Sequence, residues 1–130
     1  MTNGGDESPV GELVLRTLAM PRDTNPAGDI FGGWLMSQMD IAGAMVAVHE
    51  ARGRVATIAV NGMVFHKPVK VGHVLCCYAD LMKIGRTSVT VNVQAWALDR
   101  EKESEARVKV TEGVFTYVAI GPDRKPRPVK

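Results

Sequence analysis

The feature that most constrains the fold of this chain is a helical segment that is apolar on nearly every side. The segment runs from Gly33 to about Glu50 and carries one acid, Asp40, in its middle. A helix that is apolar all round is a buried helix, and a buried ionised carboxylate is costly unless a partner compensates its charge. Asp40 is therefore interpreted either as a side chain that reaches water at a sheet edge or as a group with a chemical role.

The rest of the chain is predicted to form strands. Residues 87–98 alternate apolar and polar residues, which is typical of an antiparallel strand with one buried face. In the last strand the apolar positions change phase near Gly113, which predicts a bulge. The helix is expected to end at residues 52–54, with Gly53 in the position that follows the cap. The predicted strands cover residues 12–20, 55–65, 73–84, 87–98 and 107–119, with connections at residues 67–72 and 85–86 and a charged hairpin tip at residues 99–104.

This order of elements predicts an α+β domain in which an antiparallel sheet curls around the long helix. One sheet covers only part of such a helix, so we expect the chain to form a dimer or a higher assembly. The 130 residues predict one domain, residues 12–120, between a flexible polar tail at residues 1–11 and an irregular basic tail at residues 121–130.

Composition argues against several functional classes. The net charge is only +2 and aromatic residues make up 5% of the chain, so neither bulk charge nor base stacking favours nucleic acid. No apolar run approaches the roughly 20 residues of a membrane span. The polar start lacks the basic and apolar regions of a signal peptide, and we expect a cytoplasmic protein.

The cysteines and histidines do not predict a metal site. Cys76 and Cys77 are adjacent in a predicted strand, where neighbouring side chains point to opposite faces. Together with His49, His66 and His73 they match no zinc-ligand spacing.

The start of the helix is the first candidate site. The backbone N–H groups at a helix amino terminus are unpaired and carry positive potential, and Gly32 and Gly33 would let a substrate oxygen approach them closely. With Asp40 about two turns further along, this arrangement suits acyl transfer. The alternative is that the glycines only form a tight turn. Gly43 and Ala44, next to Asp40 on the helix, are small enough to let another backbone or a ligand come close.

Two further segments carry polar groups with more than one interpretation. Asn25 could offer its amide to orient a water molecule or could only close a turn, and Asp29 is interpreted as a turn or cap residue. The turn Gly85-Arg86-Thr87-Ser88 combines a guanidinium, two hydroxyls and backbone amides, which suits a phosphate. It could equally be an ordinary hairpin turn with a solvated arginine. Lys67 could add positive charge to a site.

Several motifs occur in one order and spacing from about Leu13 to Ala119. They are Pro21-Arg22-Asp23-Thr24-Asn25, Gly28-Asp29-Ile30-Phe31-Gly32-Gly33-Trp34, Ser37-Gln38-Met39-Asp40, Met63-Val64-Phe65, Lys67-Pro68, Val71-Gly72, Gly85-Arg86-Thr87-Ser88 and Val114-Phe115-Thr116-Tyr117-Val118-Ala119. Together they resemble the bacterial acyl-CoA thioesterases of the YciA type, which are members of the hotdog-fold superfamily.

The resemblance implies a hotdog fold, in which a curved antiparallel sheet wraps one long helix. It implies that sheets pair in homodimers, which assemble further into a hexamer, a trimer of dimers. The implied reaction is hydrolysis of a short- to long-chain acyl-CoA thioester to the free acid and coenzyme A, without a metal or an organic cofactor. The active site would lie at the dimer interface.

The resemblance also implies roles for particular residues. Asp40 would be the catalytic carboxylate, as general base or nucleophile, and Asn25 would reach it from the other subunit. The amide of Gly32 or Gly33 would polarise the thioester carbonyl. The turn Arg86-Thr87-Ser88 would hold the phosphates of coenzyme A, with Lys67 nearby.

Three alternatives remain at this point. A non-hydrolytic acyl-CoA binding or sensing module could use the same fold. A related dehydratase would need a catalytic histidine near the start of the helix, and residues 30–34 contain none. A structural protein without a ligand would leave the combination of Asn25, Gly32 and Asp40 unexplained.

Overall fold

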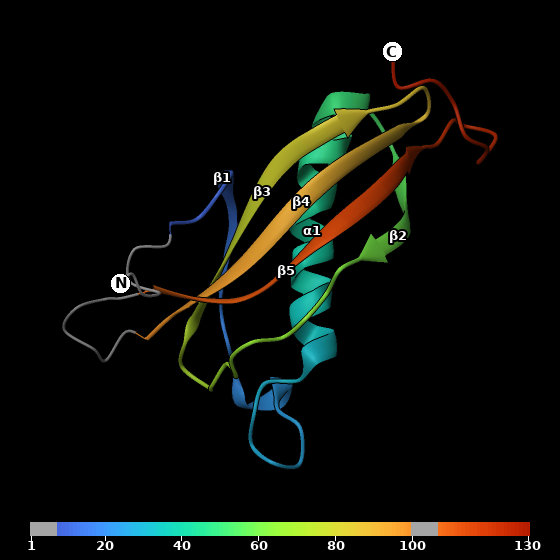
Figure 1. Ribbon diagram of the computed structural model, residues 1–130. Helices are drawn as coiled ribbons and strands as arrows, with labels where there is room; N and C mark the ends of the chain where they lie inside the picture. The colour runs from blue at the N-terminus through green and yellow to red at the C-terminus, as the bar shows by residue number, and fades with distance from the viewer. Residues whose placement is uncertain (1–7, 100–106) are drawn as a thin grey trace.

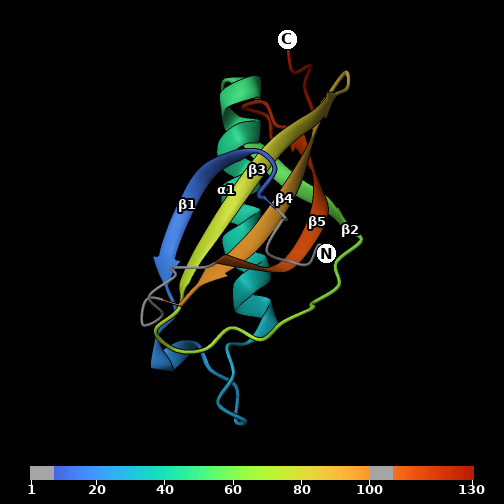
Figure 2. The same ribbon diagram turned by 60° about the vertical axis from the view of Figure 1, so that its left-hand side comes forward.

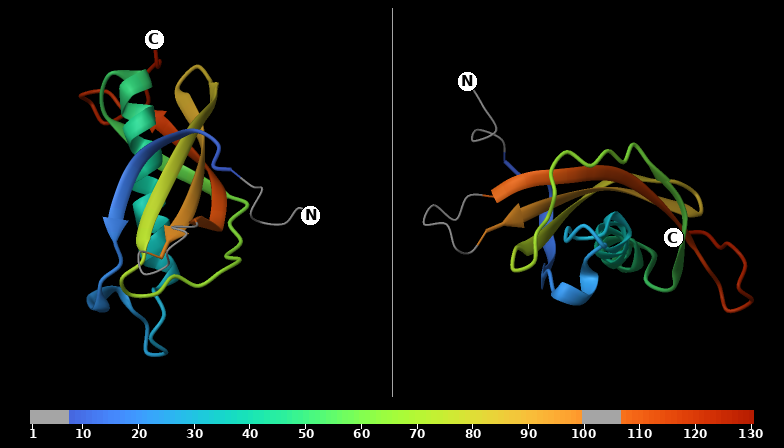
Figure 3. Two further views of the ribbon diagram at one scale, coloured as in Figure 1. Left: turned by 90° about the vertical axis from the view of Figure 1, so that its left-hand side faces the viewer. Right: turned by 90° about the horizontal axis from the view of Figure 1, so that it is seen from below.

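The computed structural model describes residues 8–99 and 107–130 and shows one long helix against a curved sheet (Figure 1). The sheet has the strand order β1-β3-β4-β5-β2, and all neighbouring strands are antiparallel. Seen from below, it arches over the helix on one side only (Figure 3, right). The elements are β1 (Glu12–Leu18), the 3₁₀ turn η2 (Pro21–Asp23), α1 (Gly32–Ala51), β2 (Val55–Asn61), β3 (Val74–Ile84), β4 (Ser88–Leu98) and β5 (Arg107–Ala119).

The predicted helix is confirmed, but its carboxyl end differs in detail. Arg52, not Gly53, takes the left-handed conformation there, with φ of 53°. Gly53 lies beside the C-terminal segment instead: a Cβ at that position would be 2.7 Å from Nη2 of the Arg127 side chain, which would have to move. Arg127 Nη2 donates a hydrogen bond of 2.8 Å to the Ala51 carbonyl, which has no acceptor role inside the helix. The C-terminal segment thus caps α1, a contact between distant residues that local sequence does not reveal.

Removing this cap has a predictable effect on stability. Arg127→Ala leaves the Ala51 carbonyl without its donor, and we expect the free energy of unfolding to fall by about 1–3 kcal/mol. Urea denaturation followed by circular dichroism measures this change. Lys125→Ala in the same segment, an exposed side chain, serves as the control and is expected to stay within about 0.5 kcal/mol of the parent. Equal stability of both variants would contradict the capping role.

The strand after the helix is shorter than predicted. β2 ends at Asn61 and not at Phe65, because Gly62 takes φ of +72° and turns the chain away from the sheet. Residues 62–73 connect β2 to β3 without regular structure. The Val64 carbonyl in this segment accepts a hydrogen bond of 2.6 Å from Thr111 Oγ1 on β5. This connection brings Phe65 and its neighbours to the amino-terminal end of α1, as Figure 2 shows for the light-green segment.

The pattern of β4 is confirmed on one face only. Its apolar positions are buried under the helix, as the alternation predicted. On the opposite face, however, Gln94 and Trp96 are also buried, and Trp96 Nε1 donates 3.0 Å to Gln94 Oε1. Trp96 packs with Cys76 and Tyr78 in a second, small cluster. The half-buried strand that we predicted is therefore covered on both faces in its second half.

The bulge in β5 lies three residues before the predicted position. Ala95 pairs with Thr111 and Trp96 with Lys109, so Val110 is the extra residue. Val110 and Thr111 are consecutive and both buried, which is the phase change seen in the sequence. Of the predicted hairpin tip, all but Asp99 lies outside the described residues.

One face of α1 remains uncovered in the single chain. Ile41, Met45 and Val48 are 50%, 52% and 43% exposed, whereas Met39, one of the residues facing the sheet, is fully buried. An apolar stripe of this kind marks a contact surface. It agrees with the expectation that a second copy completes the fold. Within the described part of the chain, no helix is long and apolar enough to cross a membrane.

The residues after β5 form no helix or strand, and they pack closely against the domain. Val129 is buried in the main core, and its N–H donates 2.9 Å to the Arg86 carbonyl. The predicted irregular segment at residues 121–130 is therefore part of the folded domain surface. It joins the end of α1 to the β3–β4 turn at the top of Figure 1.

Candidate active site

Asp40 lies in the third turn of α1 and is only partly buried. Its carboxylate Oδ1 accepts a hydrogen bond of 2.7 Å from the hydroxyl of Thr57 on β2. Both side chains reach the surface of the single chain, and Asp40 directly precedes Ile41 in the exposed stripe of α1. The acid therefore has a defined partner and one oxygen left for other interactions.

The main chain of Asp40 is held as well. Its carbonyl accepts 2.8 Å from the hydroxyl of Tyr117, a fully buried residue on β5. Burial, followed by the negative charge of the Asp40 side chain close by, raises the pKa of Tyr117 above its usual value. The phenol therefore stays protonated and remains a donor.

Sequence reasoning missed both Thr57 and Tyr117. Threonine and tyrosine are ordinary strand residues, and neither stands at a fixed spacing from Asp40 that would mark a site. Their role follows only from the folding of β2 and β5 against the middle of α1. The motif around Tyr117 contributed to the family resemblance but gave no hint of its partner.

The amino terminus of α1 offers free backbone donors. The N–H groups of Trp34 and Leu35 both bond to the Phe31 carbonyl, whereas those of Gly32 and Gly33 precede the first possible helical acceptors. Both glycines are exposed. A hollow of about 290 Å³ adjoins Gly32 and is walled by Phe65 and Lys67.

The loop before the helix is closed by Asn25. Its Oδ1 accepts from the N–H groups of Ala27 at 2.9 Å and Asp29 at 3.1 Å, which is the turn-forming alternative of the sequence interpretation. The side-chain amide nitrogen has no hydrogen bond within the described part of the chain, so an orienting role is compatible with the turn. Asp29 does not act as a helix cap, because its carboxylate pairs with Lys70.

One chain does not bring these groups together. Asp40 is seven residues after Gly33 and eight after Gly32, which places them about 10–12 Å apart along the helix axis. A reacting carbonyl must lie about 3 Å from both the acid and the amide donors. The loop containing Asn25 is further away still, beyond the amino-terminal end of α1 (Figure 1).

The predicted phosphate turn lies at the opposite end of α1 from Lys67. The Gly85 N–H donates 2.8 Å to the Ser88 carbonyl and closes the turn, while Arg86 is exposed. The Thr87 carbonyl accepts a hydrogen bond of 2.8 Å from the Ala119 N–H. Lys67 lies instead in the hollow next to Gly32. The structure therefore separates Lys67 from the turn Arg86-Thr87-Ser88 within one chain.

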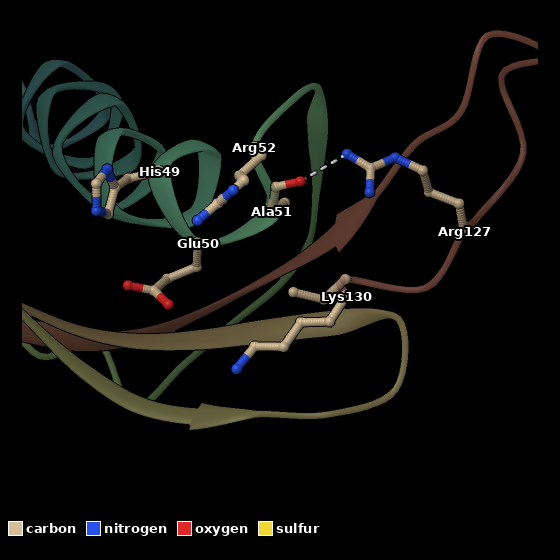
Figure 4. Close-up of a pocket in the computed structure, with 7 residues that line it drawn as sticks. His49, Glu50, Ala51, Arg52, Arg127 and Lys130 are labelled. Atoms are coloured by element: carbon tan, nitrogen blue, oxygen red, sulfur yellow. Dashed lines mark hydrogen bonds between the residues drawn. The ribbon is translucent and has the colours of Figure 1, made fainter.

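A larger hollow of about 720 Å³ lies beside this turn, between the carboxyl end of α1 and the C-terminal segment (Figure 4). Its lining includes the cations Arg52, Arg127 and Lys130 and one acid, Glu50. Val129, which also lines it, connects it to Arg86 through the backbone hydrogen bond described above. The arrangement suits an anionic group, since cations outnumber the acid.

Other reactive side chains do not compete for a catalytic role. Cys76 and Cys77 are free thiols buried in the sheet. Burial, with a smaller effect of Cys76, raises the pKa of Cys77 to about 12, so this thiol is protonated at neutral pH and not a nucleophile. Among residues 8–99 and 107–130, no three side chains gather in a way that could hold a metal ion.

A long helix cradled by a curved antiparallel sheet, with an acid in the middle of the helix, defines a hotdog-fold domain. Residues 27–104 match the model of the thioesterase superfamily, and the chain belongs to this family. It is 58% identical over 125 residues to the acyl-CoA thioester hydrolase YciA of Salmonella typhimurium, which covers 95% of this chain and 94% of that protein.

Solved structures give the same result. The hexameric thioesterase y2039 from Yersinia pestis is 58% identical and superposes with a TM-score of 0.87 over 95% of this chain and 98% of its own. An acyl-CoA hydrolase from Staphylococcus aureus, solved with butyryl coenzyme A and coenzyme A, is 29% identical with a TM-score of 0.80, over 88% of this chain and 68% of its own. Variants of the staphylococcal enzyme with one aspartate or one threonine replaced by alanine have also been solved.

Proposed function

We propose that this protein is an acyl-CoA thioester hydrolase in which Asp40 acts on the thioester. The observation that carries the proposal is the hydrogen bond from Thr57 to the Asp40 carboxylate, on a fold and a family of thioesterases. The aspartate and the threonine replaced in the staphylococcal enzyme stand 17 residues apart, the same separation as Asp40 and Thr57.

The chemistry needs only a few groups. As a general base, Asp40 takes a proton from a water molecule whose oxygen attacks the thioester carbonyl carbon. The bond between carbon and sulfur then breaks, and coenzyme A leaves as a thiolate that acquires a proton. Because a thiolate is a good leaving group, one carboxylate and one or two N–H donors for the carbonyl oxygen suffice. Thr57 keeps the carboxylate oriented by donating to one of its oxygens.

The donors for the carbonyl oxygen come from a second copy of the chain in this proposal. The amides of Gly32 and Gly33 are too far from Asp40 within one chain, so the helix start and Asn25 of the partner subunit would complete the site. The exposed stripe of Ile41, Met45 and Val48 supports such a contact. The hexameric state of the Yersinia relative supports assembly of dimers into a hexamer.

Coenzyme A would extend from Asp40 toward the carboxyl end of α1. This end is about 16 Å away along the axis, a distance that an extended pantetheine arm covers. There Arg86, Thr87 and Ser88 would meet the phosphates beside the cationic hollow shown in Figure 4. Lys67 lies at the amino-terminal end of α1 in the same chain. It would therefore contact only a substrate whose coenzyme A is bound by the partner subunit.

Removing the exposed guanidinium tests the phosphate turn. Arg86→Ala should raise the KM for an acyl-CoA about tenfold, because one charge-assisted contact to a phosphate is lost. The kcat should stay within about twofold of the parent, since the contact is the same in ground and transition states. Arg16→Ala on β1, at the far edge of the sheet, is the control. An unchanged KM in Arg86→Ala would place the nucleotide elsewhere.

The experiment that tests the function is a panel of acyl-CoA esters of increasing chain length, incubated with the purified chain while free thiol is followed. The proposal expects many turnovers per subunit on at least part of the panel. Binding of the esters without thiol release would instead support the non-hydrolytic sensing module.

A cytoplasmic location is part of the proposal, and the free thiols of Cys76 and Cys77 agree with a reducing compartment.

A further inference from the structure

Two hydrogen bonds that hold Asp40 come from one pair of neighbours in the sheet. Thr57 on β2 and Tyr117 on β5 stand directly opposite each other in the antiparallel ladder. Thr57 donates to the carboxylate at 2.7 Å, and Tyr117 donates to the main-chain carbonyl of the same residue at 2.8 Å. One step of the sheet therefore fixes both the side chain and the backbone of Asp40.

The sheet is irregular at this step. The register shifts between Thr57 and Ala59, which leaves Ile58 as an extra residue on β2. A bulge of this kind changes the direction of neighbouring side chains and is frequent beside active sites. The pair of Thr57 and Tyr117 is the last regular one before the shift.

Gly43 provides the space for the phenol. It lies three residues after Asp40 on the same side of α1, and a Cβ at this position would be 2.3 Å from the Tyr117 hydroxyl and 3.1 Å from its ring. Glycine weakens a helix interior relative to alanine, so its presence in the middle of α1 needs a reason. The sequence predicted that another backbone or a ligand comes close here, whereas at Gly43 the side chain of Tyr117 fills this space.

We propose that Tyr117 is a positioning residue for hydrolysis. Through the space left by Gly43, its hydroxyl fixes the height and rotation of α1 over β5, so that the Asp40 carboxylate stays in its hydrogen bond with Thr57. Tyr117 is fully buried, so in this proposal it acts through Asp40 and not on the substrate directly. The positioning role rests on the proposed function, because it matters for turnover only if Asp40 acts on the thioester.

The first test is Tyr117→Phe, which removes one oxygen and keeps the ring in the core. We expect kcat to fall on the order of 10-fold, as small displacements of a reacting group do, while KM changes less than twofold. Tyr78→Phe is the matched control, because Tyr78 is also buried but packs in the cluster on the other face of the sheet. Parental kcat in Tyr117→Phe, with only a lower unfolding temperature, would mean a merely structural role and would overturn the proposal.

The second test uses the contact with Gly43. Gly43→Ala should lower kcat more than Tyr117→Phe does, because its Cβ meets the hydroxyl. In the double variant the hydroxyl oxygen closest to the new Cβ is gone. The remaining contact, between this Cβ and the ring of residue 117, can be relieved by a small shift. The double variant should therefore return to the kcat of Tyr117→Phe. A double variant as poor as Gly43→Ala would contradict the proposal. If Gly43→Ala does not fold, the comparison of the two tyrosine variants decides alone.

Asp40→Asn, assayed beside these variants, distinguishes a failure of the proposed role of Asp40 from a failure of the positioning role of Tyr117. Parental turnover in Asp40→Asn would remove Asp40 from the reaction and would overturn the positioning role of Tyr117 with it. Loss of turnover in Asp40→Asn with parental kcat in Tyr117→Phe would overturn the positioning role only.

Discussion

Asp40→Asn is expected to lower kcat for acyl-CoA hydrolysis by about 10³-fold, since an amide neither accepts a proton from water nor attacks the thioester. The fold should not change, because asparagine has nearly the same volume and its oxygen still accepts the hydrogen bond from Thr57. Thiol release under saturating substrate measures kcat, and circular dichroism with size-exclusion chromatography verifies fold and assembly.

The control for this variant is Asp80→Asn, the same change from carboxylate to amide at an exposed position on β3. It should hydrolyse acyl-CoA at close to the parental rate. A correctly assembled Asp40→Asn protein with the same kcat as Asp80→Asn would remove Asp40 from the mechanism.

Mixed oligomers should recover activity that neither parent variant has. The second variant is Gly32→Pro, which deletes one N–H at the first position of α1. Proline is well tolerated at that position, Phe31 before it is already extended, and the nearest atom to a new Cβ is 3.6 Å away. Loss of one donor to the carbonyl oxygen should lower kcat by about 10²–10³-fold.

Co-refolding Asp40→Asn with Gly32→Pro in equal amounts then reports whether the site is shared. If Asp40 of one subunit works with the helix start of the other, each mixed dimer contains one site with no substitution, and random mixing should restore about a quarter of the parental activity. A mixture that stays at the level of the separate variants would show that each site uses groups of one chain only. If Gly32→Pro alone keeps parental kcat, Gly33→Pro takes its place.

Local sequence signals were sufficient for the elements and for the residues of the helix. Apolar density and the flanking glycines predicted α1 to within one residue at each end, and alternation predicted β4. Asp40 and Gly32 could be selected because their chemistry follows from their place on one helix. Element order predicted a curved antiparallel sheet around the helix, and the family resemblance identified this arrangement as a hotdog fold.

Features that depend on contacts between distant segments were not predictable. The capping of the Ala51 carbonyl depends on Arg127, which is 76 residues away in the sequence. The early end of β2 depends on Gly62, whose turn is one of several that glycine allows. The burial of Trp96 on the outer face needs neighbours on β3, which alternation within β4 does not describe.

The same reason explains what was missed at the site. Thr57 and Tyr117 act through their register in the sheet and through the placement of β2 and β5 against α1. Tyr117 fits the pattern of β5 as a core residue. Its hydrogen bond to the Asp40 carbonyl can be recognised only in the folded structure. Asp40 could be selected from the sequence, but the groups that hold it could not.

The most direct measurement is a crystal structure of Asp40→Asn with an uncleaved short-chain acyl-CoA. The account predicts that the thioester carbonyl carbon lies beside residue 40 of one subunit. Its oxygen should accept a hydrogen bond of about 3 Å from the N–H of Gly32 or Gly33 of the partner subunit, with the phosphates at the Arg86 turn. A thioester bound away from residue 40, or next to it with no contribution from a second subunit, would contradict the account.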